Sequence, residues 1–223
     1  MYRERRSRIE GAVVWSGAAA AETRVLPDGC MDLLWLDDTL VVAGPDTTAY
    51  LHPRSDADRV LGIRLQSGIG PAAFGVPADA LRDRRVPLED LWTATDVRRL
   101  VERVAAAPDR TLALETIVGA RLRTDRPDRR MQDAAAMLRA GADVAAVADA
   151  VGYSERQLHR RSLAAFGYGP KVLARIHRFQ RALELVRRGT PAAHAALAVG
   201  YADQAHLSRE TTRLAGSPLS MLG

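Results

Sequence analysis

The sequence predicts an α+β protein in which a small β barrel or sandwich is followed by a helical connector and by an all-α domain with two helix-turn-helix units. Three observations lead to this fold class. Over roughly the first hundred residues, short β-type runs alternate with turns rich in Pro, Gly and Asp. From residue 96 onward, apolar residues recur every three or four positions, as in amphipathic helices. Near the C-terminus, one local pattern occurs twice.

Residues 1–95 are predicted to form the β-rich domain. Turns such as Pro27-Asp28-Gly29 and Gly44-Pro45-Asp46 separate runs with the composition of β-strands. These runs are residues 12–15, 23–26, 30–36, 40–43 and 61–65. The basic segment 3–8 precedes the first run, and we expect it to be a solvated chain end.

Residues 96–126 are predicted to form the helical connector. Pro108 and Asp109 separate two helices, each with an apolar stripe. The stripes consist of Val97, Leu100, Val101 and Val104 in the first helix and of Leu114, Ile117, Val118 and Leu122 in the second. The charged segment 124–130, which contains Pro127, is the expected linker to a domain formed by residues 127–223.

The repeated pattern covers residues 144–167 and 192–216. In each copy a short helix rich in Ala and Val reaches a Val-Gly-Tyr turn, whose glycine is Gly152 in the first copy and Gly200 in the second. A glycine ends a helix there because the chain needs a left-handed conformation. A polar residue then begins a second helix, so that each copy predicts a helix-turn-helix unit.

The second helix of each unit begins at a side chain that can cap it. Ser154 and Asp203 offer oxygens to free backbone N–H groups, and Gln157 completes the spacing of a capping box. The inward rows are Leu158, Ser162 and Phe166 in the first unit and Leu207, Thr211 and Ala215 in the second. The outward positions are Arg156, His159 and Arg160 in the first unit and Gln204, Ala205, Ser208 and Arg209 in the second, with His206 at the edge.

Residues 170–188 are predicted to form one long helix between the two units. It opens with a proline at a natural first-turn position and ends before Gly189. Its buried face consists of Leu173, Ile176, Phe179, Leu183 and Val186. Lys171 and Arg178 lie on other faces. They are candidate phosphate contacts, although long cationic side chains on a helix are more often solvated surface.

A generic helical bundle also has helices that end in glycine and outer faces that carry arginine. Two copies whose glycines stand forty-eight residues apart, joined by one helix, are much harder to obtain from generic packing. The repetition therefore favours a pair of helix-turn-helix units.

The block from about residue 131 to the end resembles the DNA-binding domain of AraC-type (AraC/XylS) transcriptional regulators. The matching stretches are AVADAVGYSERQLHRR, FGYGPKVLARIHRFQRALELV and AVGYADQAHLSRE, followed by LAGSPLSML. The resemblance implies seven helices, a double-stranded DNA target and no cofactor. It places base contacts on the same outward positions, namely Arg156, His159, Arg160, Gln204, Ala205, Ser208 and Arg209.

The resemblance also bears on the first domain. In AraC-type regulators a β-rich N-terminal part is commonly a cupin-like sensor followed by helices that mediate dimerisation. PDGCMDLLW and GVPADALRDRRVPLEDLW resemble abbreviated N-terminal domains of this kind. Trp35 and Arg64 are the candidate ligand-binding residues. The alternatives to a ligand-binding role are structural. Trp35 then lies on a buried strand, and Arg64 is a partly exposed charge on a strand.

The inward rows depart from the family pattern. Ser162, Thr211 and Ala215 stand where the family usually has large aromatic residues, so less apolar area is buried. We expect the second unit to be the looser one, with Leu163 and Leu214 able to compensate. The departure also keeps an alternative open, in which the N-terminal half is a small-molecule-binding or protein-interaction module and the helix-turn-helix domain is degenerate.

The formal charge is concentrated in the C-terminal domain. Residues 127–223 contain fourteen Lys and Arg against eight Asp and Glu, a net of +6, whereas residues 1–126 have a net of −1. Phosphate contacts supply most nonspecific affinity for DNA, so this asymmetry suits a DNA-binding half. Lys171 is the only lysine, and the preference for Arg together with abundant Ala is typical of a GC-rich coding bias.

Enzyme functions find little support in the sequence. A metal-dependent cupin needs clustered His and carboxylate ligands, yet His52 is the only histidine before His159. Cys30 has no His or Lys nearby in the sequence to activate it as a nucleophile, and a buried core position explains it better. We therefore expect no catalytic residue and no metal.

The remaining expectations concern location and partners. No long apolar run follows the N-terminus as in a signal peptide or a membrane helix, and a single cysteine permits no internal disulfide. We expect a cytoplasmic protein without membrane contact. The sequence leaves open the effector, the formation of a homodimer, and activation or repression; RNA polymerase is an expected partner if the protein is an activator.

Overall fold

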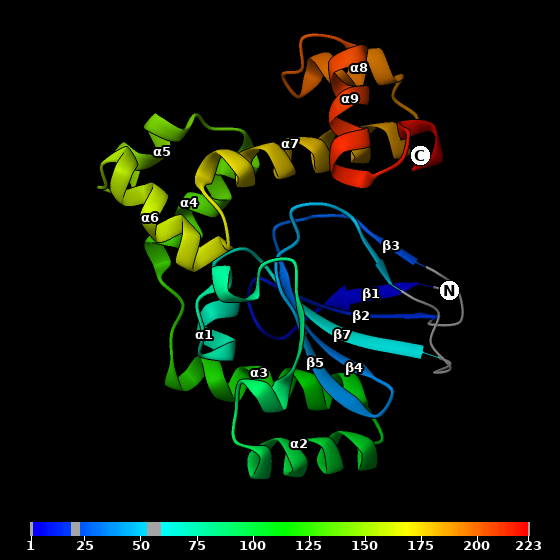
Figure 1. The fold of residues 1–223 in the computed structure, drawn as a ribbon, viewed down its shortest axis with the longest axis vertical. Coiled ribbons are helices and arrows are strands. Elements are labelled where there is room, and N and C mark those ends of the chain that lie inside the picture. The colour runs from blue at the N-terminus through cyan, green and yellow to red at the C-terminus, as the bar shows by residue number, and fades with distance from the viewer. Residues whose placement is uncertain (1, 19–22, 53–58, 223) are drawn as a thin grey trace.

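The computed structural model describes residues 2–18, 23–52 and 59–222. Figure 1 shows a sheet-containing N-terminal part and a C-terminal part made of helices, with the long helix α7 (Pro170–Arg187) running above the sheet. The predicted α+β fold class is confirmed.

The N-terminal part is built on a six-stranded sheet in which all neighbouring strands are antiparallel. Its strands, in spatial order, are β1 (Arg3–Arg6), β2 (Ala12–Ala18), β7 (Arg59–Leu65), β4 (Met31–Leu36), β5 (Thr39–Ala43) and β8 (Arg85–Pro87). A separate pair is formed by β3 (Thr23–Val25) and β6 (Tyr50–His52). Each of the five predicted β-type runs overlaps one of these strands.

The basic N-terminal segment is not a solvated chain end. β1 pairs with β2 along its whole length, in the register Arg3 to Ser16 and Arg6 to Val13. The buried carboxylate of Glu115 holds this strand in place, because it accepts hydrogen bonds from the Arg5 guanidinium, the Ser7 hydroxyl and the Arg8 backbone N–H. The prediction was wrong because this pairing depends on a carboxylate more than a hundred residues away.

The two helices predicted as a connector pack against the sheet. α2 (Ala94–Ala106) and α3 (Arg110–Thr124) begin at Thr93 and Asp109, whose side chains accept hydrogen bonds from backbone N–H groups of the first turn. Val104 and Leu114 lie in the same hydrophobic cluster as the sheet residues Leu33, Ile63 and Leu65. Residues 96–126 therefore contribute to the core of the N-terminal part.

Short helices complete the N-terminal part, and two of them contact the C-terminal part. They are α1 (Gly70–Phe74), η1 (Ala78–Leu81) and η2 (Leu88–Asp90). η1 and α1 both contact α6, so they form part of the surface on which the C-terminal helices rest. Figure 1 shows α1 between α3 and the helices above it.

The C-terminal part consists of helices that surround α7. The others are α4 (Arg129–Ala140), α5 (Val144–Ala150), α6 (Glu155–Phe166), α8 (Ala192–Ala198) and α9 (Gln204–Ala215), followed by the short helix η3 (Leu219–Met221). The predicted apolar face of α7 is confirmed for Leu173, Ile176, Phe179 and Leu183, which are all at most 1% exposed.

α7 packs into two hydrophobic clusters. The larger one joins α4, α5 and α6 to Leu173, Ile176, Phe179 and Leu183 of α7, and it includes Leu214 and Ala215 of α9. The smaller one consists of Ala182, Ala196, Tyr201 and Leu207 under α8 and α9. Residues of the second unit therefore lie in both clusters.

Candidate nucleic-acid interface

The turn of the first helix-turn-helix unit follows from its local sequence. Gly152 has a φ of +71°. The N–H of Tyr153 then donates to the carbonyl of Ala148 at 2.9 Å, which closes the end of α5. Ser154 caps α6 by accepting from the Gln157 N–H at 3.2 Å, and the Gln157 side chain accepts from the Ser154 N–H at 2.9 Å. The predicted capping box is thus present.

The second unit repeats this construction with different residues. Gly200 has a φ of +86°, and the Tyr201 N–H donates to the carbonyl of Ala196 at 2.9 Å. Asp203 caps α9 by accepting from the His206 N–H at 2.6 Å. Since both second helices start where the sequence predicts, the expected side-chain rows also hold.

The predicted inward rows are buried in both helices. Residues 158, 162 and 166 of α6 and residues 207, 211 and 215 of α9 are at most 1% exposed. Leu214 is also fully buried, whereas Leu163 is half-buried at the outer surface of α6. The two inward hydroxyls differ: Thr211 donates to the Leu207 carbonyl at 2.9 Å, and Ser162 has no hydrogen-bond partner.

The residues predicted to face DNA are all exposed. They lie in the first two turns of the second helix of each unit: Arg156, His159 and Arg160 in α6, and Gln204, Ala205, Ser208 and Arg209 in α9. His206, predicted at the edge of the row, is half-buried against the Tyr201 ring. We call these two sets the reading faces of α6 and α9.

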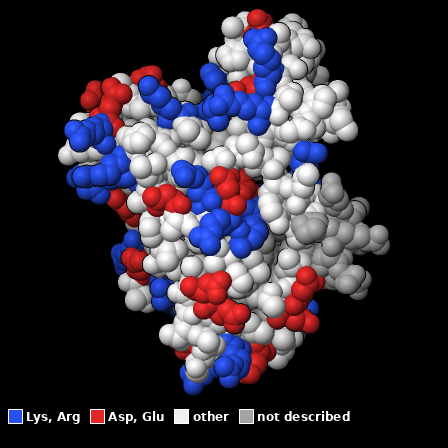
Figure 2. Space-filling model, in the orientation of Figure 1, with Lys and Arg blue, Asp and Glu red and all other residues white. Residues whose placement is uncertain are grey.

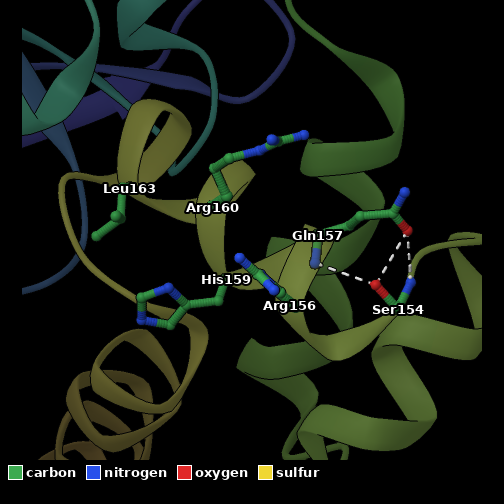
Figure 3. Close-up of a pocket in the computed structure, with 6 residues that line it drawn as sticks. All are labelled: Ser154, Arg156, Gln157, His159, Arg160 and Leu163. Atoms are coloured by element: carbon green, nitrogen blue, oxygen red, sulfur yellow. Dashed lines mark hydrogen bonds between the residues drawn. The ribbon is translucent and has the colours of Figure 1, made fainter.

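The reading face of α6 is concave. A surface depression of about 590 Å³ is lined by Ser154, Arg156, Gln157, His159, Arg160 and Leu163. Figure 3 shows these side chains around the helix, with the capping box at its start. The His159 ring rests against the chain where α7 begins, because a Cβ on Gly169 would lie 2.8 Å from its Nε2 atom. A larger residue at position 169 would therefore clash with the His159 ring in this position.

The tyrosine of each turn lies beneath a guanidinium group. The Arg161 guanidinium lies 4.7 Å from the centre of the Tyr153 ring, and that of Arg130 lies 5.5 Å from it. In the second unit, Arg178 lies 4.5 Å above the Tyr201 ring. Contacts of this kind are attractive and hold long cationic side chains in place.

The two phosphate candidates on α7 differ in freedom. Lys171 is exposed. Arg178 is half-buried and, besides covering Tyr201, donates to the Gly200 carbonyl at 3.5 Å. A second arginine of α7, Arg175, forms an ion pair with Glu210 of α9 at 2.9 Å. The second unit is therefore attached to α7 by polar contacts as well as by its small apolar cluster.

Basic side chains lie over the helical part of the molecule. On the face shown in Figure 2, Lys and Arg are prominent in the upper part, whereas acidic and basic groups are interspersed below. This distribution agrees with the net charge of +6 for residues 127–223. An electropositive surface around two exposed helices is what binding to phosphate requires.

A second candidate site lies between the two parts of the chain. A cavity of about 550 Å³ has Arg64 in its wall, and Trp35 is not among the residues that line it. The lining residues are Val13, Asp28, Cys30, Arg64 and Gln66 from the N-terminal part, and Arg139, His177, Gln180, Arg181, Glu184, Arg187 and Arg188 from α4 and α7. Trp35 is 3% exposed and packs in the core, with the Arg110 guanidinium 5.7 Å from its ring.

Arg64 is not a free cation in this cavity. Its Nε lies 3.3 Å from Asp28 and 3.5 Å from Asp32. Burial raises the pKa of Asp32 to about 6, although Arg64 acts in the opposite direction. Burial also raises the pKa of the Cys30 thiol, so the neutral thiol is favoured and a nucleophilic role is disfavoured.

Sequence reasoning did not single out His177 of α7. It is 4% exposed, and its Nε2 has no hydrogen-bond partner. Burial, and then the charge of Arg139, lowers its pKa to about 4. A signal was present, because Leu173, His177, Gln180 and Glu184 fall on one face of a helix, and this face meets the N-terminal part.

Two further features are absent from the described part of the chain. Within residues 2–18, 23–52 and 59–222, no three His, Cys, Asp or Glu side chains gather where they could hold a metal ion. No helix in those ranges combines the length and the apolar character needed to cross a membrane.

Comparisons with known proteins give two matches to family models. Residues 147–222 match a helix-turn-helix domain, and residues 11–87 match a domain of unknown function. No curated protein matches the chain.

Solved structures with a similar fold include three of ToxT from Vibrio cholerae. The apo form of a ToxT variant from strain SCE256 is 10% identical and has a TM-score of 0.51, with 98% of this chain and 100% of that chain covered. ToxT from strain O395 is 10% identical at a TM-score of 0.50, with 96% and 99% covered. A further crystal form is 10% identical at a TM-score of 0.51, with 99% and 97% covered. At this identity the likeness concerns the fold, which extends over both parts of the chain.

Proposed function

We propose that this protein is a sequence-specific DNA-binding transcriptional regulator of the AraC type, and the match of residues 147–222 to a helix-turn-helix domain supports this proposal. The observation that carries the proposal is the pair of capped helices, α6 and α9, whose inward rows are buried and whose reading faces are exposed. The proposed activity is binding, and it requires no cofactor and no catalytic residue.

The side chains of the reading faces suit the base edges of a major groove. Arg156, Arg160 and Arg209 can each donate two hydrogen bonds to guanine, and Gln204 can pair with adenine in the same bidentate way. The remaining positions of the reading faces are His159, Ser208 and Ala205. Ser208 can bond to several base edges, and Ala205 can contact a thymine methyl group. We propose that α6 and α9 read successive segments of the major groove.

α7 is the proposed spacer between the two reading helices. Its 18 residues span ~27 Å at the usual rise of a helix, and two half-sites on one face of DNA lie about 34 Å apart. Lys171 is a proposed phosphate contact at the start of this spacer. Arg178 covers the Tyr201 ring, so moving it to a phosphate would cost the attraction between the guanidinium and that ring.

We further propose that a small anionic effector regulates the protein from the cavity between its two parts. Five arginines line this cavity, and ion pairs occupy Arg64 and Arg188. Arg139, Arg181 and Arg187 supply the excess positive charge, and the Nε2 of His177 has no partner. Because Trp35 lies in the core, the effector site is assigned to this cavity and to Arg64 rather than to the interior of the sheet domain.

The effector proposal has a direct test. A thermal-shift screen of small carboxylates and phosphates should find compounds that raise the melting temperature, since a ligand bound only to the folded state stabilises it. Arg181→Met should abolish that rise, whereas the exposed Arg98→Met should retain it. An equal rise in both variants would place the ligand elsewhere.

The DNA-binding proposal is tested by the salt dependence of binding to duplex DNA. Each neutralised phosphate lowers the slope of log K against log salt by about 0.9, so several contacts give a steep slope. The alternative function, an interaction module with a degenerate helix-turn-helix domain, predicts no such linear loss. We include a homodimer and, if the protein is an activator, RNA polymerase among its proposed partners, and we place it in the cytoplasm with its DNA target.

A further inference from the structure

Both reading helices end against the N-terminal part of the chain. At the end of α6, Arg82 Nη1 donates to the Gly167 carbonyl at 3.1 Å. At the end of α9, Arg24 Nη1 donates to the Ala215 carbonyl at 2.6 Å, and the Ala49 N–H donates to the Leu214 carbonyl at 2.7 Å. The last carbonyls of a helix have no partner within it, so these donors satisfy groups that would otherwise bind water.

The contacts at both ends are close. A Cβ on Gly167 would lie 2.5 Å from the Pro45 side chain and 3.3 Å from the Ala78 carbonyl oxygen. A Cβ on Gly216 would lie 3.2 Å from the Arg24 guanidinium. Backbone at the end of each reading helix thus lies directly on the N-terminal part, and a positive guanidinium meets the negative end of each helix dipole.

This arrangement leaves the reading faces open. In Figure 1, α6 and α9 both point their C-terminal ends toward the sheet domain and their first turns away from it. The seven side chains of the reading faces are exposed, and within the described residues none of them forms a hydrogen bond or an ion pair with the N-terminal part. The N-terminal part therefore lies behind both helices, on the side away from their DNA-reading turns.

We propose that the N-terminal part is a brace that fixes the separation and orientation of the two reading helices, with Arg24 and Arg82 as positioning residues. The inference rests on the proposed DNA-binding function. α7 alone joins the two units along the chain. The second unit rests on it through the small apolar cluster, through Leu214 and Ala215 in the larger one, and through the Arg175–Glu210 ion pair and the contact of Arg178 with Tyr201. Contacts with the N-terminal part at the C-terminal end of each reading helix restrict the motion that a connection through α7 alone would allow. This restriction matters because two half-sites are bound at once only if the separation of the helices matches the spacing of the half-sites.

The first test compares DNA duplexes in which two half-sites are separated by spacers of different length. Wild-type protein should prefer one spacing by about tenfold or more, because the gain from binding both half-sites is lost when the geometry forbids it. The double variant Arg24→Met/Arg82→Met should show a flattened spacing profile but unchanged affinity for a single half-site. The double variant Arg24→Lys/Arg82→Lys should recover part of the preference, and Arg98→Met, an exposed α2 change, should match wild type.

A DNA-free measurement separates this proposal from the proposed function. Spin labels at Ala164→Cys in α6 and Arg213→Cys in α9, both exposed, report the distance between the helices in a Cys30→Ser background. The Met double variant should broaden the distance distribution, and Arg98→Met should leave it narrow. If neither protein binds duplex DNA, the proposed function fails while this distribution still decides the brace. An unchanged distribution, an unchanged spacing profile, or tighter operator binding by the Met double variant would overturn the brace.

Discussion

Ser162 and Thr211 are the buried hydroxyls of the two reading helices, and they differ in one respect. Both side chains are fully buried, but only Thr211 has a hydrogen-bond partner, the Leu207 carbonyl at 2.9 Å. We predict that Ser162→Ala stabilises the first unit. Thr211→Val, which also removes a hydroxyl from an inward row, should not stabilise the second.

The magnitude follows from the environment of each oxygen. A buried polar group without a partner costs about 1–3 kcal/mol, and Ala is preferred to Ser inside a helix by about 0.5 kcal/mol. The small space left by the Ser162 oxygen offsets part of this gain, so we expect a net stabilisation of about 1–2 kcal/mol. Thr211→Val loses a hydrogen bond worth about 1 kcal/mol and should be neutral or destabilising by up to that amount.

The assay is urea unfolding followed by far-UV circular dichroism, combined with amide hydrogen exchange. Exchange is needed because a chain with two parts can unfold in more than one step, and protection of residues 144–167 identifies the step that belongs to the first unit. A gain of 1 kcal/mol should raise the melting temperature by about 2–4 °C for a chain of this length.

The comparison between the two variants makes the reasoning refutable. If Ser162→Ala loses 1 kcal/mol or more while Thr211→Val is neutral, the Ser162 hydroxyl has a partner and the account of its burial is wrong. If both variants gain equally, the Thr211 hydrogen bond contributes nothing to stability.

Three further predictions concern other parts of the fold. Glu115→Gln should destabilise the chain by about 1–3 kcal/mol in urea, because the buried Glu115 carboxylate loses its charge while its partner Arg5 is 47% exposed and screened by solvent. Burial acts to raise the pKa of Glu115, but its three hydrogen-bond donors outweigh burial and lower the pKa. This stability should therefore be present above about pH 4.3 and lost as the pH falls. Burial raises the pKa of Asp32 to about 6, so the folded state holds this proton more tightly than the unfolded state does. The stability of the wild type should therefore decline from about pH 4 to about pH 7, by on the order of 2 kcal/mol relative to Asp32→Asn. Parallel curves of stability against pH for the two proteins would contradict this. Gly200→Ala should cost about 1–2 kcal/mol in thermal unfolding through its φ of +86° alone, since no atom lies within 4 Å of the added Cβ, and Gly200→Asn should cost less.

The local features of the C-terminal domain could be predicted from the sequence. Gly152 and Ser154 flank Tyr153 directly. The end of α5 and the start of α6 depend on these neighbouring residues. The period of 3.6 residues then fixes which positions are inward. For the same reason the exposure of Arg160 and Arg209 could be predicted before their surroundings were known.

Features that depend on distant parts of the chain could not be predicted. All four residues of the strand at Arg3–Arg6 are exposed and lack an alternating apolar pattern, and the strand is held by its contacts with β2 and Glu115. The cavity around Arg64 and His177 forms only when the two parts of the chain meet. No local sequence pattern specifies how the two parts pack together. For the same reason, the hydrogen bonds from Arg24 and Arg82 to the helix ends could not be predicted from the sequence.

The most direct test of the central claim is a competition experiment by fluorescence anisotropy with the full chain. The labelled probe is DNA from upstream of its own gene, and the competitor is random duplex DNA at two salt concentrations. The account predicts saturable, salt-sensitive binding and a preference for the probe that falls by about 5- to 150-fold in Arg160→Ala and in Arg209→Ala, which corresponds to 1–3 kcal/mol per lost base contact. Arg98→Ala should retain the wild-type preference. An unchanged preference in both reading-face variants, or binding of probe and random DNA with equal affinity by the wild type, would contradict it.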